Sequence, residues 1–279
     1  MIYLPLLGSV ALSATQVLEK IGLRKKKINS NHFVVALFLT AVVVMIPLMF
    51  FFGKLDSQAF EFKNILIFAG IVLFTILANI CYYKAMKWEK LSELEPVHLL
   101  QPLFLVLLAS IFFVSERNLN ILIPSIIAAL ALIFSHVKKH HLRFDKYILI
   151  AILGSLFYAL ENLLVKIILP YYSPLSMYFF RSLFALIFLY LIFRPKFSKE
   201  IKGKERWIIL VTAVLWIFYR VLAFYGYLEL GLVFTTLILM LSPIFVYFLA
   251  FKFLGEKPGW RNIVAAIVIL ASVLYAVLI

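Results

Sequence analysis

The sequence predicts an all-α integral membrane protein of about ten transmembrane helices, arranged as two inverted five-helix repeats. Three observations lead to this fold class. Hydrophobic residues make up 65% of the 279 residues and charged residues only 14%, whereas a soluble domain carries about 25% charged residues. Several apolar runs reach the roughly 20 residues needed to cross a hydrocarbon core of about 30 Å. Short motifs also recur in the same order in the two halves of the chain.

The apolar runs predict the spans one after another. Because the bilayer core holds no water for backbone groups, continuous apolar runs of this length must be helices. Their lack of alternation excludes a β-barrel. Spans are expected near residues 2–23, 33–53, 64–86, 93–115, 119–137, 147–169, 174–194, 207–228, 232–254 and 260–279.

The charges between the spans predict the orientation. A formal net charge of +14 would suggest nucleic-acid binding in a soluble protein, but here the basic residues lie in the short gaps between apolar runs. Gaps after odd-numbered spans hold eighteen lysines and arginines, including Arg24 to Lys27, and the other gaps hold three. We therefore expect cytoplasmic odd-to-even loops, both termini outside, no nucleic-acid partner, and a multi-pass location in the cell membrane (plasma or inner).

An internal repeat predicts the division of the chain into residues 1–140 and 141–279. Leu7-Gly8-Ser9 recurs 146 residues later as Leu153-Gly154-Ser155. Gln101-Pro102-Leu103-Phe104 and Ser115-Glu116-Arg117 recur at offsets of 141 and 140 as Ser242-Pro243-Ile244-Phe245 and Gly255-Glu256-Lys257. Since each unit has five spans, an odd number, the second copy must enter the membrane upside down, as in many secondary transporters.

At these residues the sequence resembles the EamA-type family of the drug/metabolite transporter superfamily. The resemblance is carried by Tyr82-Tyr83-Lys84-Ala85-Met86 with its second-half counterpart Phe224-Tyr225-Gly226-Tyr227, and by the repeated motifs just named. It covers essentially the whole chain and implies a ten-helix metabolite or amino-acid transporter, often an exporter. Two features depart from the family. The arginine common in the second helix of a repeat is present as Arg181 but replaced by Leu37 in the first copy, and family members often have cytoplasmic termini.

Charged side chains inside the apolar spans predict the site, because each costs at least about 2.5–3.5 kcal/mol at the bilayer centre. Glu161, Arg181 and Arg220 lie about 13 or 14 residues from the cytoplasmic ends of their spans and so share one depth. The repeat maps Glu161-Asn162 onto Thr15-Gln16 and Arg220 onto Asn79. Only the second half is then charged, with a net +1 at this level. The predicted substrate-binding residues are Gln16, Asn79, Tyr82, Tyr158, Glu161, Asn162, Arg181, Tyr219 and Arg220.

Each of these features has a plainer alternative. Glu161 and one arginine can form a structural ion pair, and the tyrosines can serve packing alone. Glu161 is also a candidate for a proton-coupling site. Pro102 and Pro243 hold equivalent places in two spans, where they predict helix kinks that serve a pathway or simply packing. Lys166, near a helix end, is expected to extend to solvent.

These observations predict a secondary transporter that moves a small polar or amphipathic metabolite, amino-acid-like or anionic, by alternating access. Its expected partners are that small molecule, the lipid bilayer and a coupling proton. Alternatives are an exporter or flippase for cationic or lipid-linked compounds, an intramembrane enzyme that uses Glu161, and a scaffold without transport. The sequence has no phosphate-binding glycine loop, no metal-ligand spacing and no nucleophile elbow. We therefore expect no enzyme activity, no metal and no cofactor.

Overall fold

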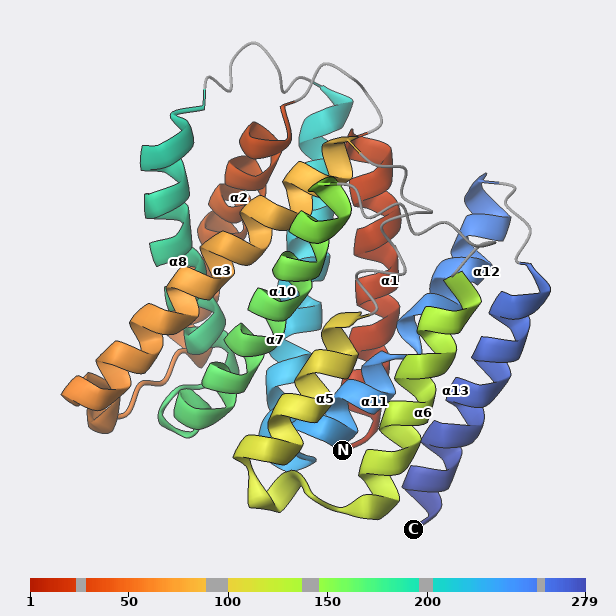
Figure 1. The fold of residues 1–279 in the computed structure, drawn as a ribbon. Helices are drawn as coiled ribbons and strands as arrows, with labels where there is room; N and C mark the ends of the chain where they lie inside the picture. The colour runs from red at the N-terminus through yellow and green to blue at the C-terminus, as the bar shows by residue number, and fades with distance from the viewer. Residues whose placement is uncertain (24–28, 89–99, 137–145, 196–202, 255–258) are drawn as a thin grey trace.

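The computed structural model describes residues 1–23, 29–88, 100–136, 146–195, 203–254 and 259–279 as a bundle of α-helices (Figure 1). The first half contributes α1 (Tyr3–Leu23), α2 (Ser30–Phe52), α3 (Phe62–Trp88), α5 (Leu100–Phe112) and α6 (Leu119–His136). The second half contributes α7 (Lys146–Ile168), α8 (Pro174–Phe193), α10 (Lys204–Glu229), α11 (Leu232–Leu239), α12 (Ser242–Leu254) and α13 (Trp260–Leu278). Most of the basic loop residues that predict the orientation, and Glu256 and Lys257, lie outside the described residues.

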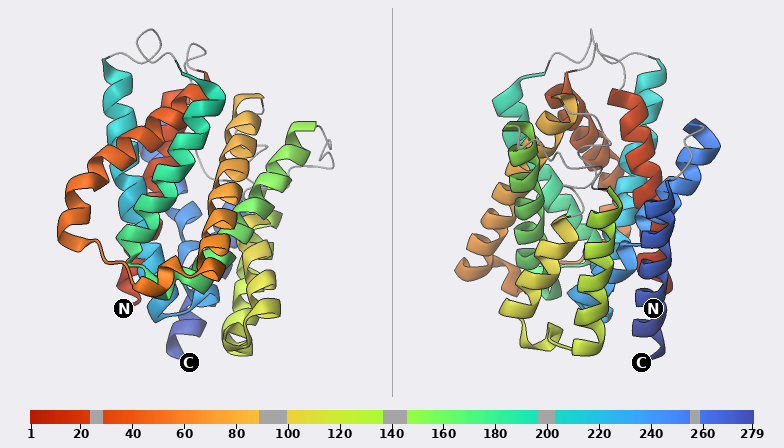
Figure 2. Two further views of the ribbon diagram at one scale, coloured as in Figure 1. Left: turned by 90° about the vertical axis from the view of Figure 1, so that its left-hand side faces the viewer. Right: turned by 45° about the vertical axis from the view of Figure 1, so that its right-hand side comes forward.

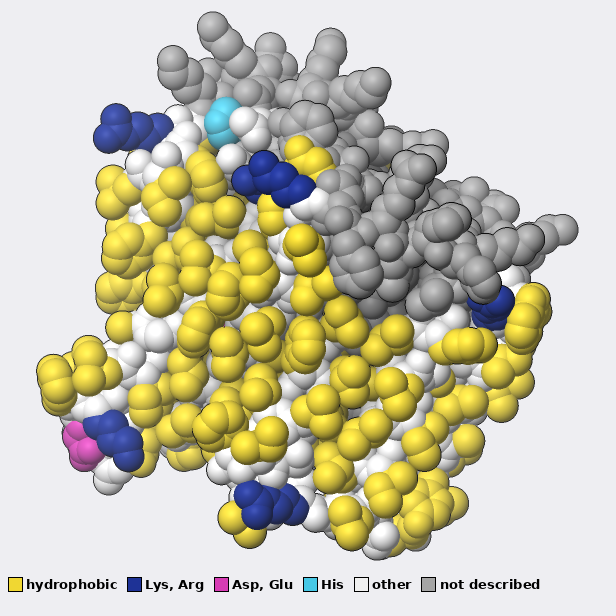
Figure 3. Space-filling view, viewed as in Figure 1, with side chains coloured by type: hydrophobic (Ala, Val, Ile, Leu, Met, Phe, Trp, Pro, Cys, Tyr) yellow, Lys and Arg dark blue, Asp and Glu magenta, His cyan; other side chains and the backbone are white. Residues whose placement is uncertain are grey.

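Long apolar helices make this a multi-pass membrane protein. Among the described residues, six helical segments have the length and composition to cross a bilayer. They are Ser30–Phe52, Phe62–Ala85, Leu149–Tyr171, Pro174–Phe193, Glu205–Glu229 and Leu232–Leu249, and shorter apolar helices cover Leu100–Phe112, Leu119–Ala131 and Ile263–Leu278. Hydrophobic side chains cover most of the visible face, and the lysines and arginines seen there lie toward its two ends (Figure 3).

The helix packing repeats itself between the two halves. α3 packs against α7 and α1 against α10, while α2 packs against α8 and α6 against α13. In the repeat, α1 corresponds to α7, α2 to α8, α3 to α10 and α6 to α13. Exchanging corresponding helices turns the α3–α7 pair into the α10–α1 pair, and it leaves the α2–α8 and α6–α13 pairs unchanged. In Figure 1, α1 runs away from the end of the bundle that holds both termini, and α7 runs toward it. The further views in Figure 2 show the two termini at this same end.

Two glycines show how closely this repetition is kept. A Cβ at Gly8 on α1 would lie 3.6 Å from the Tyr219 carbonyl oxygen and 3.7 Å from the Leu222 side chain, both on α10. A Cβ at Gly154 on α7 would meet the Ala78 carbonyl oxygen at 3.5 Å and the Cys81 side chain at 3.0 Å, both on α3. The offsets are the 146 and 141 residues found in the sequence. The paired helices thus meet at equivalent residues in both halves, although only at Gly154 would an added Cβ press on its neighbour.

The end of the bundle that holds both termini is linked by hydrogen bonds between its loops. These loops contain the short 3₁₀ helices η1 (Ser57–Phe60), η2 (Val114–Glu116) and η3 (Leu169–Tyr171). The Lys54 amide donates to Ser176 Oγ at 2.9 Å, the Ser173 amide to the Lys54 carbonyl at 3.0 Å, and the Asp56 amide to the Tyr171 carbonyl at 2.9 Å. Leu55 and Tyr172 form an isolated antiparallel bridge. The α2–α3 and α7–α8 connections are therefore joined.

One predicted span is divided. Residues 232–254 form two helices, α11 and α12, separated by a turn at Met240 and Leu241. Pro243 lies at the second residue of α12, where its missing N–H needs no partner inside the helix. Pro243 thus stands at the beginning of a helix rather than within it. Pro102 is the third described residue of α5 (Leu100–Phe112), and the residues before Leu100 lie outside the described part of the chain, so the kink expected at Pro102 stays a prediction.

Candidate substrate cavity

A buried ion pair between α7 and α8 anchors the candidate site. Arg181 donates from Nη1 to Oε1 of Glu161, and both residues are almost wholly buried. The start of α8 sets the position of this arginine. Ser173 caps the helix by accepting from the Ser176 amide, and Pro174 occupies its first position. The structural ion pair that the sequence left as an alternative is present, and Arg181 is the partner.

Arg220 on α10 is held by a different set of groups. Its Nη1 donates to Asn162 Oδ1 at 3.1 Å and lies 4.0 Å from Oε1 of Glu161. Asn162 in turn donates from Nδ2 to the Tyr158 carbonyl at 2.8 Å, and the Tyr227 hydroxyl lies 3.4 Å from its Oδ1. Asn162 therefore orients Arg220, while Glu161 mainly serves Arg181.

Aromatic rings surround both guanidinium groups. Arg220 Cζ lies 5.3 Å from the Trp216 ring centre, 5.4 Å from that of Tyr219 and 5.9 Å from that of Tyr158. Arg181 Cζ lies 4.7 Å from the ring centre of Tyr178. At these distances the negative ring faces attract the cations without removing their hydrogen-bonding capacity. A positive charge is thereby tolerated at membrane depth.

A buried carboxylate on α1 completes the charged groups, and the sequence analysis missed it. Glu19 is fully buried, and its Oε1 accepts from Trp216 Nε1 at 2.8 Å and from the Tyr83 hydroxyl at 3.0 Å. The Tyr82 hydroxyl lies 3.3 Å from its Oε2. These described partners are neutral donors on α3 and α10.

Glu19 corrects two expectations. First, the first half of the chain also carries a buried charged residue, Glu19. Second, the buried charged residues are Glu19, Glu161, Arg181 and Arg220, two carboxylates and two guanidinium groups, in place of the predicted net charge of +1. Sequence position misled the prediction, because Glu19 lies near the end of its span, where charges normally reach solvent. One signal was available. Gln16 and Glu19, three residues apart, share a helix face, as side chains at that spacing do.

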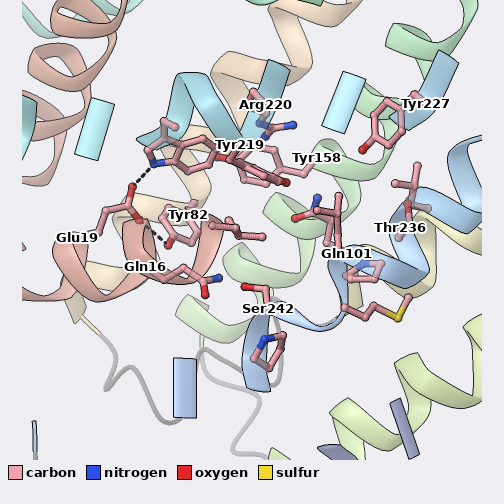
Figure 4. Close-up of a pocket in the computed structure, with 17 residues that line it drawn as sticks. Gln16, Glu19, Tyr82, Gln101, Tyr158, Tyr219, Arg220, Tyr227, Thr236 and Ser242 are labelled. Carbon is pink, nitrogen blue, oxygen red and sulfur yellow. Dashed lines mark hydrogen bonds between the residues drawn. The ribbon is translucent and has the colours of Figure 1, made fainter. Parts of the chain in front are cut away.

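A cavity of about 130 Å³ opens between helices of both halves (Figure 4). Its polar lining side chains include Glu19 on α1 and Arg220 on α10. The Trp216 indole, which donates to Glu19, has its ring centre 5.3 Å from Arg220 Cζ. The other lining residues are Leu12, Gln16, Tyr82, Gln101, Pro102, Leu105, Tyr158, Trp216, Tyr219, Tyr227, Thr236, Leu239, Met240, Ser242 and Pro243. We call this space the main cavity.

A second, smaller cavity of about 30 Å³ adjoins the main one. Tyr158, Trp216 and Arg220 line both, so these three side chains form the wall between them. Its remaining lining residues are Leu37, Phe38, Ala41, Asn79, Tyr83, Tyr178, Arg181 and Ala213. We call it the inner cavity.

The predicted site residues separate into three groups. Five line the main cavity, namely Gln16, Tyr82, Tyr158, Tyr219 and Arg220, as do Pro102 and Pro243. Asn79 and Arg181 line the inner cavity, which Tyr158 and Arg220 also reach. Glu161 and Asn162 line neither and instead contact the arginines.

The sequence analysis did not predict the roles of three polar side chains at the site, those of Ser13, Gln101 and Ser242. Ser13 on α1 donates to the Ser242 carbonyl at 2.9 Å, and the two hydroxyls are 3.1 Å apart. This contact fastens α1 to the first turn of α12. Ser242 and Gln101, which occupy equivalent places in the repeat, both line the main cavity. The sequence matched these two positions only as motif letters, because their exposure to a cavity depends on how the helices are arranged.

The fold and the cavity together define a class of protein. Helices of two similar halves enclose a cavity that is largely aromatic and carries a few convergent polar groups, an arrangement typical of membrane carriers. The sequence matches the EamA-like transporter family over residues 1–137 and again over residues 145–278. The chain belongs to this family, and the predicted resemblance is confirmed.

Comparison with solved structures concerns the fold alone. One crystal structure, described only as that of a protein, is similar with a TM-score of 0.72 and 16% sequence identity. The similarity covers 99% of this chain and 96% of the other. No curated protein matches the chain.

Proposed function

We propose that this transporter is a secondary carrier for a small zwitterionic metabolite, amino-acid-like in its charges, and that it works by alternating access. We further propose that it spans the cell membrane with ten helices as two inverted repeats. The observation that carries the substrate class is that Glu19 and Arg220 line the same cavity. A carboxylate of the substrate suits the guanidinium group of Arg220, and an ammonium group suits Glu19.

This assignment changes the residue that meets the ammonium group. The sequence analysis named Glu161 as the buried carboxylate of the site, but Glu161 is occupied by Arg181 and lines neither cavity. Glu19 takes its place because its described partners donate neutral hydrogen bonds and leave its charge uncompensated. The rings of Tyr82, Tyr158 and Tyr219 supply apolar surface for the remainder of the substrate. Proton coupling at Glu161 stays a prediction.

The helix arrangement supports alternating access. Inverted repeats allow one half to rock against the other around a site between them. The joined loops at the end with both termini favour a state closed at that end. The division between α11 and α12 lies beside the main cavity, since Thr236, Ser242 and Pro243 all line it. A turn at this place lets the two helices move separately.

Counterflow in liposomes tests the proposal. Liposomes that hold the purified protein and one unlabelled amino acid should accumulate the same amino acid in labelled form. Glu19→Gln and Arg220→Gln should each lower the rate by about tenfold or more, because each removes a charge-assisted contact worth roughly 1.5–3 kcal/mol. Glu61→Gln, in an exposed loop, is the control and should transport normally. Absence of counterflow across a broad metabolite panel contradicts the proposal.

An exporter of cationic compounds is the second candidate, and the aromatic surroundings of Glu19 favour it. Tyr82 and Trp216 both donate to this carboxylate and both line the main cavity, an arrangement that suits an organic cation. Amino-acid methyl esters separate the two candidates because they lack the carboxylate. If esters are carried as well as the parent amino acids, and Arg220→Gln leaves their transport unchanged, the cation exporter is correct.

A further inference from the structure

The inner cavity is lined by both buried arginines. Arg181 and Arg220 reach it from α8 and α10, and their side chains are only 3% and 4% exposed. No carboxylate is among the described residues that line it. Within 4.0 Å of either guanidinium, the described residues provide one carboxylate, that of Glu161. A buried cation without a full partner is strongly disfavoured.

Each arginine also has a free donor. The Nε–H groups of Arg181 and Arg220 are buried and have no acceptor among the described residues. Glu19 does not supply one, because its described contacts are with Trp216, Tyr82 and Tyr83. Unsatisfied buried donors are costly, and more so when they are charged. Glu161 Oε2 is likewise buried without a described hydrogen-bond partner, but Glu161 does not line the inner cavity. The two Nε donors beside this cavity therefore favour an acceptor that is bound from outside the chain.

The size of the inner cavity limits what that acceptor can be. About 30 Å³ exceeds the roughly 10–15 Å³ that one water molecule needs, so one or two water-sized species fit. Most of the remaining lining is apolar or aromatic, from Leu37, Phe38, Ala41, Ala213 and Tyr178. A weakly hydrated monovalent ion is less costly to desolvate here than a multiply charged one.

We propose that the inner cavity is a binding site for a small monovalent inorganic anion of halide size, held between Arg181 and Arg220. The site is separate from the proposed substrate position in the main cavity, although Arg220 lines both. The bound anion places a negative charge directly beside Arg220, whose one described carboxylate within 4.0 Å, that of Glu161, is already bound by Arg181. It also fixes the guanidinium group of Arg220, which the substrate carboxylate is proposed to meet.

Halide binding to the purified protein tests this site without any substrate. Chloride replaces gluconate at constant ionic strength while thermal unfolding is followed. Saturable stabilisation is expected, on the order of 3 °C at a chloride concentration about tenfold above the Kd. Bromide should act like chloride, whereas sulfate and phosphate should have no effect because a multiply charged ion costs more to desolvate among these apolar side chains. No saturable halide effect, or an equal effect of sulfate, overturns the proposal.

Two cavity-filling variants locate the ion. Ala41→Val on α2 and Ala213→Val on α10 each narrow the inner cavity without changing a charge, and each should abolish the halide effect. Gln16→Leu alters only the main cavity and should keep it. If both valine variants bind halide as the wild type does, the ion does not lie in the inner cavity. Counterflow is not part of this measurement, so a failure here leaves the proposed transport function standing.

Bromide quenching gives a second readout that does not depend on stability. Trp216 lines the inner cavity, so a variant with Trp88, Trp207 and Trp260 replaced by phenylalanine reports from that wall alone. Quenching by bromide should saturate and should be reversed by chloride. Quenching that rises linearly with bromide, unaffected by chloride, would show collisions only and would contradict the site.

Discussion

At the scale of single residues, the two glutamates in the core have different roles. Glu161 neutralises Arg181 directly, whereas Glu19 accepts hydrogen bonds from a tryptophan and two tyrosines. Removing the charge of Glu161 leaves a buried guanidinium group without its partner. Removing the charge of Glu19 leaves its neutral donors with an amide oxygen that can still accept. The same substitution should therefore affect the two positions unequally.

We expect Glu161→Gln to lower the free energy of unfolding by about 3–5 kcal/mol, as breaking one side of a buried ion pair does. Glu19→Gln should cost about 1 kcal/mol or less, because hydrogen bonds between neutral groups contribute little net stability. Thermal unfolding of both variants in detergent, in the absence of candidate substrates, measures the difference. Equal losses at the two positions would show that Glu161 and Arg181 are not coupled as described.

The residue-scale predictions from sequence had a clear limit. Equal depth along apolar spans identified Glu161, Arg181 and Arg220, because charges at the bilayer centre require a reason to be there. Depth alone does not show which arginine takes the carboxylate, since that depends on how α7, α8 and α10 are rotated. It also passed over Glu19, whose position near a helix end is common for solvated charges. In the structure, the Glu19 side chain lines the main cavity.

At the scale of elements, Glu116 connects three parts of the bundle. It lies in η2, between α5 and α6, and its two carboxylate oxygens accept from the Leu232 and Val233 amides at 2.7 and 2.9 Å. It thus caps the N-terminus of α11, where the helix dipole favours a negative charge. Lys166 on α7 lies 3.6 Å from the same carboxylate and donates to the Tyr227 carbonyl at 2.6 Å. The expectation that Lys166 simply extends to solvent was incomplete.

Glu116→Ala should lower the free energy of unfolding by about 1–3 kcal/mol, since it leaves two buried helix amides unsatisfied. Glu116→Gln should lose less, because its amide oxygen can still accept one of the two bonds. Arg117→Ala is the matched control. Its guanidinium group bonds only the Ser110 and Ile111 carbonyls of the adjacent helix end among the described residues. Thermal unfolding compares the three, and a larger loss for Arg117→Ala would contradict the proposed connection.

Helix boundaries were predictable where hydropathy decides them. The spans expected at 147–169 and 174–194 form α7 (Lys146–Ile168) and α8 (Pro174–Phe193). The interruption within 232–254 was less predictable. Pro243 signals a disturbance, but the turn before it also depends on Ser13 bonding Ser242 from α1. Contacts of that kind, between residues far apart in sequence, leave no local pattern.

At the scale of the whole molecule, the scaffold is more symmetric than its chemistry. Gly8 and Gly154 permit matching helix contacts, as the repeated motif indicates. The charged residues do not match in this way, since an offset of 146 places Val165 opposite Glu19 and Thr15 opposite Glu161. Duplication is therefore visible in sequence through packing residues, while the site must be derived from the arrangement of helices. The division near residue 140 stays a prediction.

The orientation of the bundle is the last prediction, and it follows from the loop charges. Eighteen basic residues against three place the odd-to-even loops in the cytoplasm, whereas resemblance to the family favours the reverse. Lys146 begins α7, Ser115 lies in η2 between α5 and α6, and both are exposed. In Figure 1 the start of α7 and the α5–α6 connection lie toward opposite ends of the bundle. With Cys81 replaced by alanine, Ser115→Cys should react with an impermeant maleimide added to intact cells. Lys146→Cys should react only after the membrane is opened.

The opposite pattern would mean that the basic loops face outward and that the end joined by the hydrogen bonds of Lys54, Ser173 and Ser176 faces the cytoplasm. A substrate would then enter the described state from the outside rather than from the cell.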